Sequence, residues 1–427
     1  MTTLTINKQA LIHNINVVKK ISDHSAVIAV LKGNGYGLGL TNFAYLLEQQ
    51  GIHYFAVTDL ADAVTLRENG IHGEILMLTP LYEKEEIKTA IRNRITLSIT
   101  SRECGETTDQ AYAELVSYNT ELRRNGTQST KRNRNPYFIP TVRAHLCIDT
   151  GFGRYGFLPT EKDEIVKMVQ NLKHIDITGI FSHFSSSSCK KAGHVHKQYK
   201  MFVALCNSLE EEGIAVGMRH ISSSSSLLRF PYTRLDAVRI GSAFLGRFAF
   251  PDDWGFVPIG TLDASIDDIY TLPAGHNVGY GNTYITTKTT TIAVVSAGYY
   301  HGLGIEKQTS PAPDALTPLN ILRAVKRHFT RREITAGLGY HQFPIIGKIG
   351  MNSVVLDITG YSLSIGDRVT FEINPLHINS SVPRVYLERF PVSVPNETTL
   401  SAGIRDKEPN TPFLITNTIP AKDCVNL

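Results

Sequence analysis

The sequence predicts an α/β protein, an eight-stranded (β/α)8 barrel of the TIM type followed by a mostly antiparallel β domain. Three observations lead to this fold class. Short apolar, β-branched runs alternate with segments of helical period from about residue 10 to residue 248. Eight such runs occur, which is the number that closes a parallel barrel. From about residue 249 the helical period fades, and β-rich runs separated by glycine and proline follow.

The barrel strands are expected where apolar runs too short for a helix lie between turn residues. The first two gaps contain helical segments at 43–50 and 60–69, which end at Gly51 and Gly70. Most other gaps also have room for one helix and its loops. The predicted strands are 26–31, 54–58, 74–78, 96–100, 142–148, 177–182, 218–222 and 237–240.

The barrel carries one insertion and is followed by two further segments. The gap before Val142 contains the polar stretch N-G-T-Q-S-T-K-R-N-R-N-P, so an inserted loop is expected at about 118–140. The β domain is expected at 249–388, and the proline-rich 389–427 is expected to be an extended tail. Within the β domain, strands are predicted at 284–296, 343–346, 353–358 and 368–372, a loop at 308–318 and a short helix at 320–329.

Charge and cysteine content exclude several classes of protein. The net charge of +4, from 43 basic and 39 acidic residues, is too small to indicate a nucleic-acid partner or an acidic membrane surface. The five cysteines form no C-x-x-C pair, so neither a disulfide framework nor a zinc site is expected, and no metal is assigned. No apolar stretch reaches the roughly 18 residues of a membrane span. Without a signal-like N-terminus, the protein is expected in the cytoplasm.

The most informative stretch is V-I-A-V-L-K-G-N-G-Y-G-L-G, residues 27–39. Lys32 stands where the first predicted strand ends, and four glycines within the next seven residues let the backbone turn tightly against a ligand. A lysine with a pKa lowered by burial can form a Schiff base. Spacing alone leaves an equal alternative, in which Lys32 extends its stem along the strand end and its amine into water.

Other polar residues follow the barrel strands at the same face. Taken singly, His183 could be a hydrogen-bonded core histidine and Arg239 the ion-pair partner of Asp236, and the serine runs 185–188 and 222–226 could be linkers. Their shared position at the carboxyl ends of the strands favours an active site instead. Serines and glycine after the seventh and eighth strands occupy the usual phosphate position of such barrels. A Schiff-base lysine opposite a phosphate site implies pyridoxal 5'-phosphate. The residues of this face are Lys32, Asp149, Arg154, His183, Ser223, Ser224, Arg239 and Gly241.

At this point the chain resembles a known family, the alanine racemases among the fold-type III pyridoxal-phosphate enzymes. The stretch V-L-K-G-N-G-Y-G-L-G is similar to the family's lysine motif, H-L-C-I-D-T-G-F-G-R-Y-G-F to its fifth-strand motif and G-I-F-S-H-F to its sixth. The resemblance continues in the family's order through R-H-I-S-S-S-S-S-L-L-R-F-P, D-A-V-R-I-G, V-G-Y-G-N-T-Y, S-A-G-Y-Y-H-G and I-I-G-K-I-G-M-N. It extends from about residue 11 to residue 386.

The resemblance implies a homodimer with shared active sites and two bases. Lys32 would bind the cofactor and act on one face of the substrate's α-carbon, and Tyr280 of the partner subunit would act on the other. Racemisation needs both, because a proton removed from one side must return on the opposite side. The substrate would be a small amino acid.

The resemblance also implies roles for the surrounding residues. Arg239 corresponds to the residue facing the pyridine nitrogen, and it cannot lend that nitrogen a proton, which favours quick reprotonation over transamination. His183 and Arg154 correspond to neighbours that tune the tyrosine, and Arg154 also to a substrate contact. Met351 and Tyr299 correspond to residues at the substrate's carboxylate and access path. Phosphate and cofactor contacts correspond to Tyr36, Ser223, Ser224, Gly241 and Ser242.

Several departures from the family's pattern bear on activity. Cys147 replaces a lysine, often carbamylated, that braces the arginine, so Arg154 needs another partner such as chloride. Ser223 replaces an asparagine, and Asn352 replaces an aspartate near the entrance. Ser380 replaces a tyrosine that crowds the substrate side chain, so we expect a wider pocket that also turns over serine.

The leading prediction is therefore an alanine racemase that uses a lysine and a tyrosine, with a serine or broad-specificity racemase as the alternative. A fold-type III decarboxylase is disfavoured because Arg239 stands where those enzymes need an acidic residue. A non-catalytic pyridoxal-phosphate carrier is disfavoured because it has no use for Tyr280.

Overall fold

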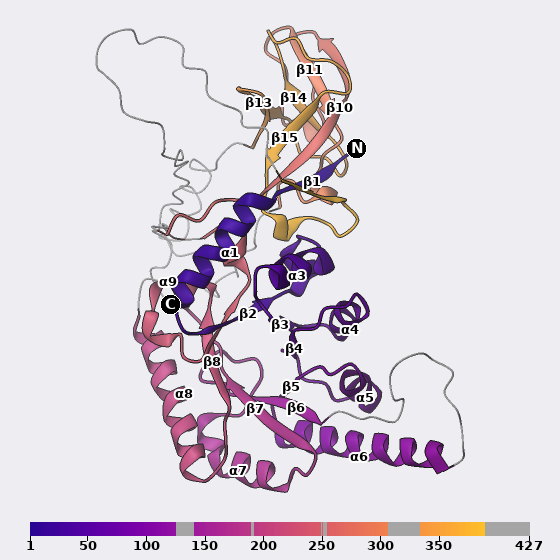
Figure 1. The fold of residues 1–427 in the computed structure, drawn as a ribbon. Helices are drawn as coiled ribbons and strands as arrows, with labels where there is room; N and C mark the ends of the chain where they lie inside the picture. Colours follow the sequence, from indigo (N-terminus) through magenta and orange to yellow (C-terminus); the bar gives the residue numbers. More distant parts are fainter. Residues whose placement is uncertain (125–140, 189–191, 249, 251–253, 306–333, 389–427) are drawn as a thin grey trace. The chain divides into compact units, whose positions relative to one another are not determined.

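The computed structural model describes residues 1–124, 141–188, 192–248, 250, 254–305 and 334–388 of the 427-residue chain. The chain forms two compact units, described here separately (Figure 1). Among the described residues, one comprises Ala10–Pro258, and the other comprises Met1–Gln9 together with the residues from Ile259 to 388. The predicted inserted loop from residue 125 on, the loop at 308–318, the helix at 320–329 and the tail at 389–427 lie outside the described residues.

The first unit is a closed parallel barrel, and all eight predicted strands are confirmed. The strand order is β4-β3-β2-β9-β8-β7-β6-β5. Backbone hydrogen bonds of 2.8 Å from Met77 N to Thr96 O and from Thr96 N to Ile75 O join β4 to the start of β5, which closes the sheet. The strands are β2 (Ala26–Val30), β3 (Tyr54–Val57), β4 (Glu74–Met77), β5 (Leu97–Ile99), β6 (Val142–Cys147), β7 (Ile175–Phe181), β8 (Met218–Ser223) and β9 (Ala237–Ile240).

Helices surround the barrel strands, and apolar side chains pack between the two layers (Figure 1). Local sequence sets several ends: Asp59 Oδ1 accepts from Ala61 N at 2.8 Å and begins α4, and Gly70 follows it at φ 81°. The helix after β5 continues to Arg124, so the first part of the predicted insertion is helical. The helices are α1 (Lys8–Ser22), α2 (Lys32–Tyr36), α3 (Leu40–Gln49), α4 (Leu60–Glu68), α5 (Lys84–Arg92), α6 (Arg102–Arg124), α7 (Lys162–Asn171), α8 (Gly193–Glu211) and α9 (Ser224–Arg229), with 3-10 turns at Pro159–Glu161, Pro231–Thr233 and Ser242–Leu245.

Two irregularities in the barrel ladder fall beside histidines. The register of β6 against β7 shifts between Ala144 and His145, and that of β8 against β9 shifts between His220 and Ser222. Such bulges change the direction in which a side chain points. Both histidines are buried, at 6% and 0% exposure.

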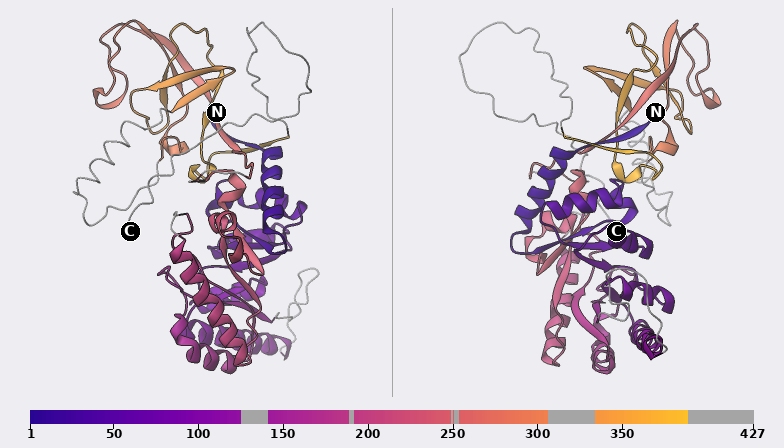
Figure 2. Two further views of the ribbon diagram at one scale, coloured as in Figure 1. Left: turned by 90° about the vertical axis from the view of Figure 1, so that its left-hand side faces the viewer. Right: turned by 45° about the vertical axis from the view of Figure 1, so that its right-hand side comes forward.

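The second unit is a mostly antiparallel β domain with little helix (Figures 1 and 2). Its sheet order is β11-β14-β13-β12-β15-β10-β1-β16, and β10 also pairs with β11. The pair β1 and β16 is parallel, and the other pairs are antiparallel. The strands are β1 (Thr3–Asn7), β10 (Gly260–Leu272), β11 (Thr290–Val295), β12 (Thr335–Leu338), β13 (His341–Ile346), β14 (Val354–Asp357), β15 (Arg368–Glu372) and β16 (Arg384–Leu387), with 3-10 turns at Tyr280–Asn282, Tyr299–His301 and Pro375–His377.

The two compact units divide the chain at residues other than the predicted domain limits, which remain a prediction. The first nine residues belong to the β unit because β1 lies between β10 and β16, and the barrel unit continues to Pro258 rather than to residue 248. Four strands of the β unit were not predicted: β1, β10, β12 and β16. No helix in the described part of the chain is long and apolar enough to cross a membrane.

Candidate active site

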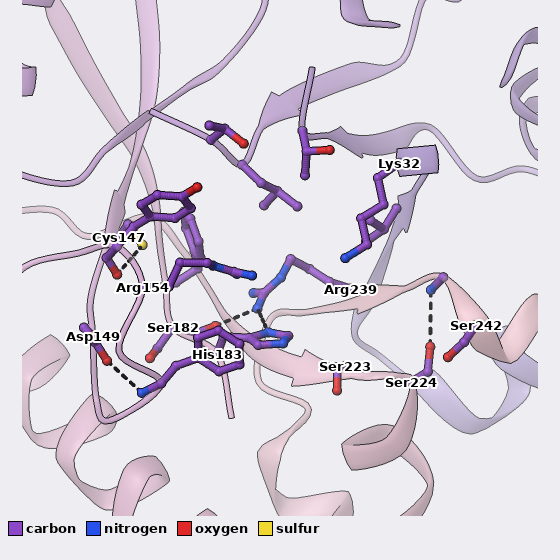
Figure 3. Close-up of a pocket in the computed structure, with 18 of the residues that line it drawn as sticks. Lys32, Cys147, Asp149, Arg154, Ser182, His183, Ser223, Ser224, Arg239 and Ser242 are labelled. Carbon is purple, nitrogen blue, oxygen red and sulfur yellow. Dashed lines mark hydrogen bonds between the residues drawn. The ribbon is translucent and has the colours of Figure 1, made fainter. Parts of the chain in front are cut away.

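A cavity of about 450 Å³ opens at the carboxyl ends of the barrel strands (Figure 3). Every site residue predicted on the barrel lines it, although the strands that carry them are far apart in sequence. Closure of the sheet brings the strand ends together, as expected for this fold. The predicted residues in the lining are Lys32, Tyr36, Arg154, His183, Ser223, Ser224, Arg239, Gly241 and Ser242.

The turn after β2 is strained. Gly33, Asn34, Gly35 and Tyr36 have φ values of 62°, 55°, 64° and 54°. All four are in the left-handed conformation, which glycine adopts readily and most other residues do not. Asn34 Oδ1 accepts a hydrogen bond from Leu40 N at 2.9 Å, which ties the turn to α3. Strain of this kind persists where surrounding structure enforces it, most often at functional sites. Both Lys32 and Tyr36, which belong to this turn, line the cavity.

Lys32 has the electrostatic environment of a nucleophilic amine. Burial lowers the pKa of its ammonium group below the usual 10.5, and the positive charge of Arg154 lowers it further. Both effects disfavour the protonated form, so more of the amine is neutral and able to attack a carbonyl. The Lys32 side chain points into the cavity, toward the space that Arg239 also faces (Figure 3).

Tyr36, Ser224 and Gly241 form a close-packed polar wall. A Cβ atom on Gly241 would lie 2.4 Å from Tyr36 Cζ and 2.5 Å from its hydroxyl oxygen, so only glycine lets the phenol lie there. Ser224 Oγ accepts hydrogen bonds from the backbone amides of Gly241 and Ala243, both at 3.2 Å. Burial raises the pKa of Tyr36 to about 12, so the phenol keeps its proton and acts as a donor.

Arg239 is the buried cation of the site, with 5% exposure. Its Nη1 donates to His220 Nδ1 at 2.7 Å and to the His220 carbonyl at 3.0 Å. Its Nη2 donates to the Ser182 carbonyl at 2.6 Å and lies 3.2 Å from His183 Nδ1. None of the described ion pairs involves Arg239, and Asp236 instead accepts from the Arg219 amide. The alternative of an Arg239–Asp236 pair is therefore wrong.

The loop after β6 carries Arg154 into the cavity. Asp149 organises this loop by accepting backbone hydrogen bonds from Gly151, Phe152 and Gly153. Burial acts to raise the Asp149 pKa, but these bonds outweigh it and the pKa is lowered. The Arg154 guanidinium lies 4.6 Å from the Phe152 ring centroid. Arg154 has no carboxylate partner among the described ion pairs.

His183 and Cys147 are both neutral. Burial and the charges of Arg239, Arg154 and Lys32 lower the pKa of His183 to about 3. Burial raises the pKa of the Cys147 thiol to about 12, and its Sγ contacts the Tyr155 carbonyl at 3.5 Å. A neutral thiol cannot brace an arginine as a carboxylate or carbamate does.

The charges that line the cavity favour an anionic ligand. Three of the lining residues, Lys32, Arg154 and Arg239, are basic, and the one acidic lining residue, Asp149, is occupied by backbone amides. In a partly buried site these cations attract a phosphate or a carboxylate. Among the described residues, no group of three or more His, Cys, Asp or Glu side chains is arranged for a metal ion.

The other predicted site residues lie on the β unit. Tyr280 is 75% exposed, and Tyr299 and Met351 are each 51% exposed, which is high for such large side chains. Backbone hydrogen bonds of 3.0 Å, from Tyr299 N to Gly350 O and from Tyr300 N to Met351 O, hold the Tyr299 turn against the Met351 loop. Ser380 is exposed in the turn before β16, and its carbonyl accepts from Arg384 at 2.7 Å.

Comparison with known proteins identifies the family. The model of the alanine racemase N-terminal domain matches residues 6–247, and that of the alanine racemase C-terminal domain matches residues 259–379. The chain belongs to the alanine racemase family. Members of this family are isomerases, and the chain is an alanine racemase-like isomerase.

Curated relatives and solved structures agree with this assignment. An alanine racemase of Clostridium tetani is 30% identical over 305 residues, which is 70% of this chain and 72% of that protein. Alanine racemase 1 of Caldanaerobacter subterraneus is 26% identical over 377 residues, 86% of this chain and 84% of the relative. The alanine racemase structures from Clostridium difficile and from a D-cycloserine-producing Streptomyces lavendulae each give a TM-score of 0.73 at 25% identity. They cover 90% and 91% of this chain, and 95% and 97% of their own.

Sequence reasoning on this alanine racemase-like chain missed part of the cavity. His220, which receives the Arg239 hydrogen bond, was not singled out, nor were Phe152, Thr58 and Thr79 in the lining. A signal for His220 existed: it is a polar residue inside a predicted strand of a barrel whose interior must be filled, and a buried polar residue needs a partner. Thr58 and Thr79 carry no comparable signal.

Proposed function

We propose that the protein is a pyridoxal-phosphate-dependent racemase that interconverts L- and D-alanine. The observation that carries the proposal is one cavity containing an amine of lowered pKa, Lys32, a hydroxyl and amide wall around Tyr36 and Ser224, and the buried cation Arg239. Membership of the alanine racemase family supports the same reaction.

The residues of the cavity fit pyridoxal phosphate. Lys32 can form the Schiff base, and Tyr36, Ser224, Gly241 and Ser242 would hold the phosphate. The close approach of Tyr36 to Gly241, where a Cβ would intrude, fits a built anion cradle rather than an incidental surface. When bound, the cofactor supplies an electron sink that acidifies the α-proton of an attached amino acid.

The residues of the chain supply the proton transfers and the positioning. Lys32, whose lowered pKa favours the neutral amine, would take or return the α-proton on one face. Arg239 would donate a hydrogen bond to the pyridine nitrogen of the cofactor without giving up its proton, since a guanidinium stays charged. Arg154 would hold the substrate carboxylate. The decarboxylase alternative is disfavoured because those enzymes need an acidic residue at the position of Arg239. Here the position holds an arginine that donates to His220 and to backbone carbonyls.

We propose that Tyr280 of the partner subunit supplies the second base in a homodimer. The 75% exposure of Tyr280 and the exposed Tyr299 and Met351 leave these side chains available for another subunit. The modest net charge gives no support for nucleic acid as a partner. The free, buried thiols of Cys104, Cys147 and Cys206 fit a reducing compartment, for which we propose the cytoplasm.

Mixing two inactive variants tests the shared site. Lys32→Ala and Tyr280→Phe proteins should each lack racemase activity, measured by separating the alanine enantiomers after incubation with L-alanine. After dissociation and reassociation at equal amounts, half the dimers are mixed and each carries one intact site. Activity should return to roughly a quarter of the wild-type value. No recovery despite proven mixing would contradict the partner role of Tyr280.

Ser380 supports a second candidate, a racemase that also accepts serine. Its small hydroxyl side chain is exposed in the turn before β16, and the family resemblance implies a tyrosine ring at this position that narrows the substrate pocket. Ser380→Tyr should lower kcat/KM for serine more than for alanine. Ser364→Tyr, a matched change in another exposed turn of the β unit, should alter neither. Equal losses for both substrates with Ser380→Tyr would refute the wider-pocket candidate.

A further inference from the structure

A buried chain of hydrogen bonds continues behind Arg239 and ends at a residue with no part in the proposed chemistry. His220 Nδ1 accepts from Arg239 Nη1 at 2.7 Å, and His220 Nε2 lies 2.9 Å from His145 Nδ1. The His145 and His220 rings meet edge to face with centroids 5.1 Å apart. His145 is 6% exposed and does not line the cavity.

The direction of each hydrogen bond follows from the chemistry of the groups. A guanidinium only donates, so His220 Nδ1 must carry no proton. In a neutral imidazole the proton is then on Nε2, and this N–H points at His145 Nδ1, which must accept. Burial and nearby positive charge hold the pKa of His145 at about 3 and that of His220 well below its usual 6.5, so both rings are neutral. Donation therefore runs from Arg239 to His220 to His145.

The backbone is shaped to place the His145 ring. Register shifts occur at His145 in β6 and at His220 in β8, and such bulges redirect side chains. Gly179 on β7 leaves the space that the His145 ring fills, since a Cβ there would lie 2.6 to 2.7 Å from three ring atoms. The His220 ring also stacks on Phe181, 5.2 Å between centroids at 14°.

We propose that His145 is a positioning residue that fixes the His220 tautomer and so holds the Arg239 guanidinium in place in the cavity lining. Without an acceptor at position 145, His220 either keeps a buried N–H without a partner or moves its proton to Nδ1. The second state sets two donors face to face at the Arg239 contact. Each state loosens Arg239. The catalytic consequence rests on the proposed function, whereas the tautomer does not.

The first test observes the tautomers directly, in the full-length protein loaded with pyridoxal phosphate. With ¹⁵N-labelled histidine, NMR should show His145 and His220 protonated at Nε2 and bare at Nδ1, unchanged between pH 5 and pH 9. In His145→Leu, the His220 ¹⁵N signals should change, either because the Nε2 proton loses its acceptor or because the proton moves to Nδ1. A wild-type His220 protonated at Nδ1, or a His220 unaffected by His145→Leu, would overturn the proposal.

The second test separates positioning from packing. Asparagine places its side-chain oxygen near the position of histidine Nδ1, so His145→Asn keeps an acceptor that His145→Leu removes. Losing a buried hydrogen bond of an arginine network should lower kcat by about tenfold or more in His145→Leu, with KM nearly unchanged, and by far less in His145→Asn. Gly179→Ala, which displaces the ring, should resemble His145→Leu. The absorption spectrum of the bound cofactor should shift in the same two variants.

His174→Leu provides a matched control. His174 lies just before β7 and contacts Asp109 outside the cavity, so its loss should affect stability but neither the spectrum nor kcat. If the loss in kcat follows the loss in melting temperature across His145→Leu, His145→Asn, Gly179→Ala and His174→Leu, His145 contributes packing alone and does not position Arg239. Because the tautomer measurement needs no turnover, a wrong function and a wrong tautomer assignment are distinguished.

Discussion

Gly241→Ala should weaken cofactor binding by a mechanism that the structure makes quantitative. The new methyl would lie 2.4 Å from Tyr36 Cε2 and Cζ, far inside van der Waals contact, so the ring must move. The Gly241 φ of −136° lies outside the left-handed region that favours glycine, so the expected loss is attributed to the clash with Tyr36. Overpacking of this kind costs about 1 to 3 kcal/mol of stability. Moving the Tyr36 hydroxyl away from an anion loses a further hydrogen bond of about 1.5 to 3 kcal/mol, or roughly ten- to a hundredfold in affinity.

Titration with pyridoxal phosphate, followed by absorbance, measures this change, and pyridoxal without its phosphate is the ligand control. Pyridoxal should bind wild type and Gly241→Ala alike. Gly105→Ala is the steric control, since its Cβ would lie 2.8 Å from Met168 Sδ, away from the cavity. Adding Tyr36→Ala to Gly241→Ala removes the clash and should restore stability without restoring affinity. An affinity for pyridoxal phosphate within twofold of wild type would refute the cradle.

Three further predictions follow from the charge state of the cavity. Below about pH 6.5 the histidines of the unfolded chain bind protons, whereas His145 and His183 of the folded protein stay neutral to about pH 3. Lowering the pH from about 6.5 to about 3 should therefore destabilise the fold. His145→Asn removes one of these two histidines and should lower the slope of melting temperature against pH. Arg154→Gln should raise the Lys32 pKa, shifting the pH midpoint of borohydride-trapped pyridoxal adduct formation upward; an unchanged midpoint would exclude the Arg154 contribution. Cys147 should resist iodoacetamide at pH 8, checked by mass spectrometry of its peptide, because its pKa is about 12; rapid labelling of the folded protein would contradict this.

The barrel could be predicted from sequence because its strands obey a simple rule. Strands buried on both faces are short apolar runs, and A-V-I-A-V in β2 or E-I-L-M in β4 cannot be mistaken for surface segments. Strand β10 was missed for the opposite reason. Its 13 residues include Asp263, Asp267 and Asp268, which point away from the core, so its apolar content is low and only the alternation marks it.

The strands at the edge of the β unit could not be predicted because their partners are distant in sequence. Strand β1 pairs with β10 and β16, more than 250 residues away, as in the register of Leu4 with Leu262 and Arg384. Each strand is only four or five residues long, too short for a reliable local pattern. Such pairings are set by tertiary packing, which no window of sequence contains.

The candidate site was predictable to the extent that its residues occupy strand ends. Lys32, His183 and Arg239 could be placed at one face from the order of strands alone. The partner of Arg239 could not, because the contact to His220 depends on a register shift in β8. The neutral state of the histidines depends on burial beside an arginine, which likewise appears only in three dimensions.

The features that break local rules gather at this cavity, and together they argue for an anionic ligand. Tyr36 has a left-handed φ of 54°, which costs a non-glycine residue about 1 kcal/mol or more. Arg239 is buried with neutral imidazoles and carbonyls as its described partners, although a buried cation is costly unless it is paired. A barrel selected for stability alone would carry neither, since an apolar core would serve better. Under the proposed function, a bound phosphate and carboxylate would supply the missing negative charge and would complete an electrostatic arrangement that the polypeptide leaves unbalanced.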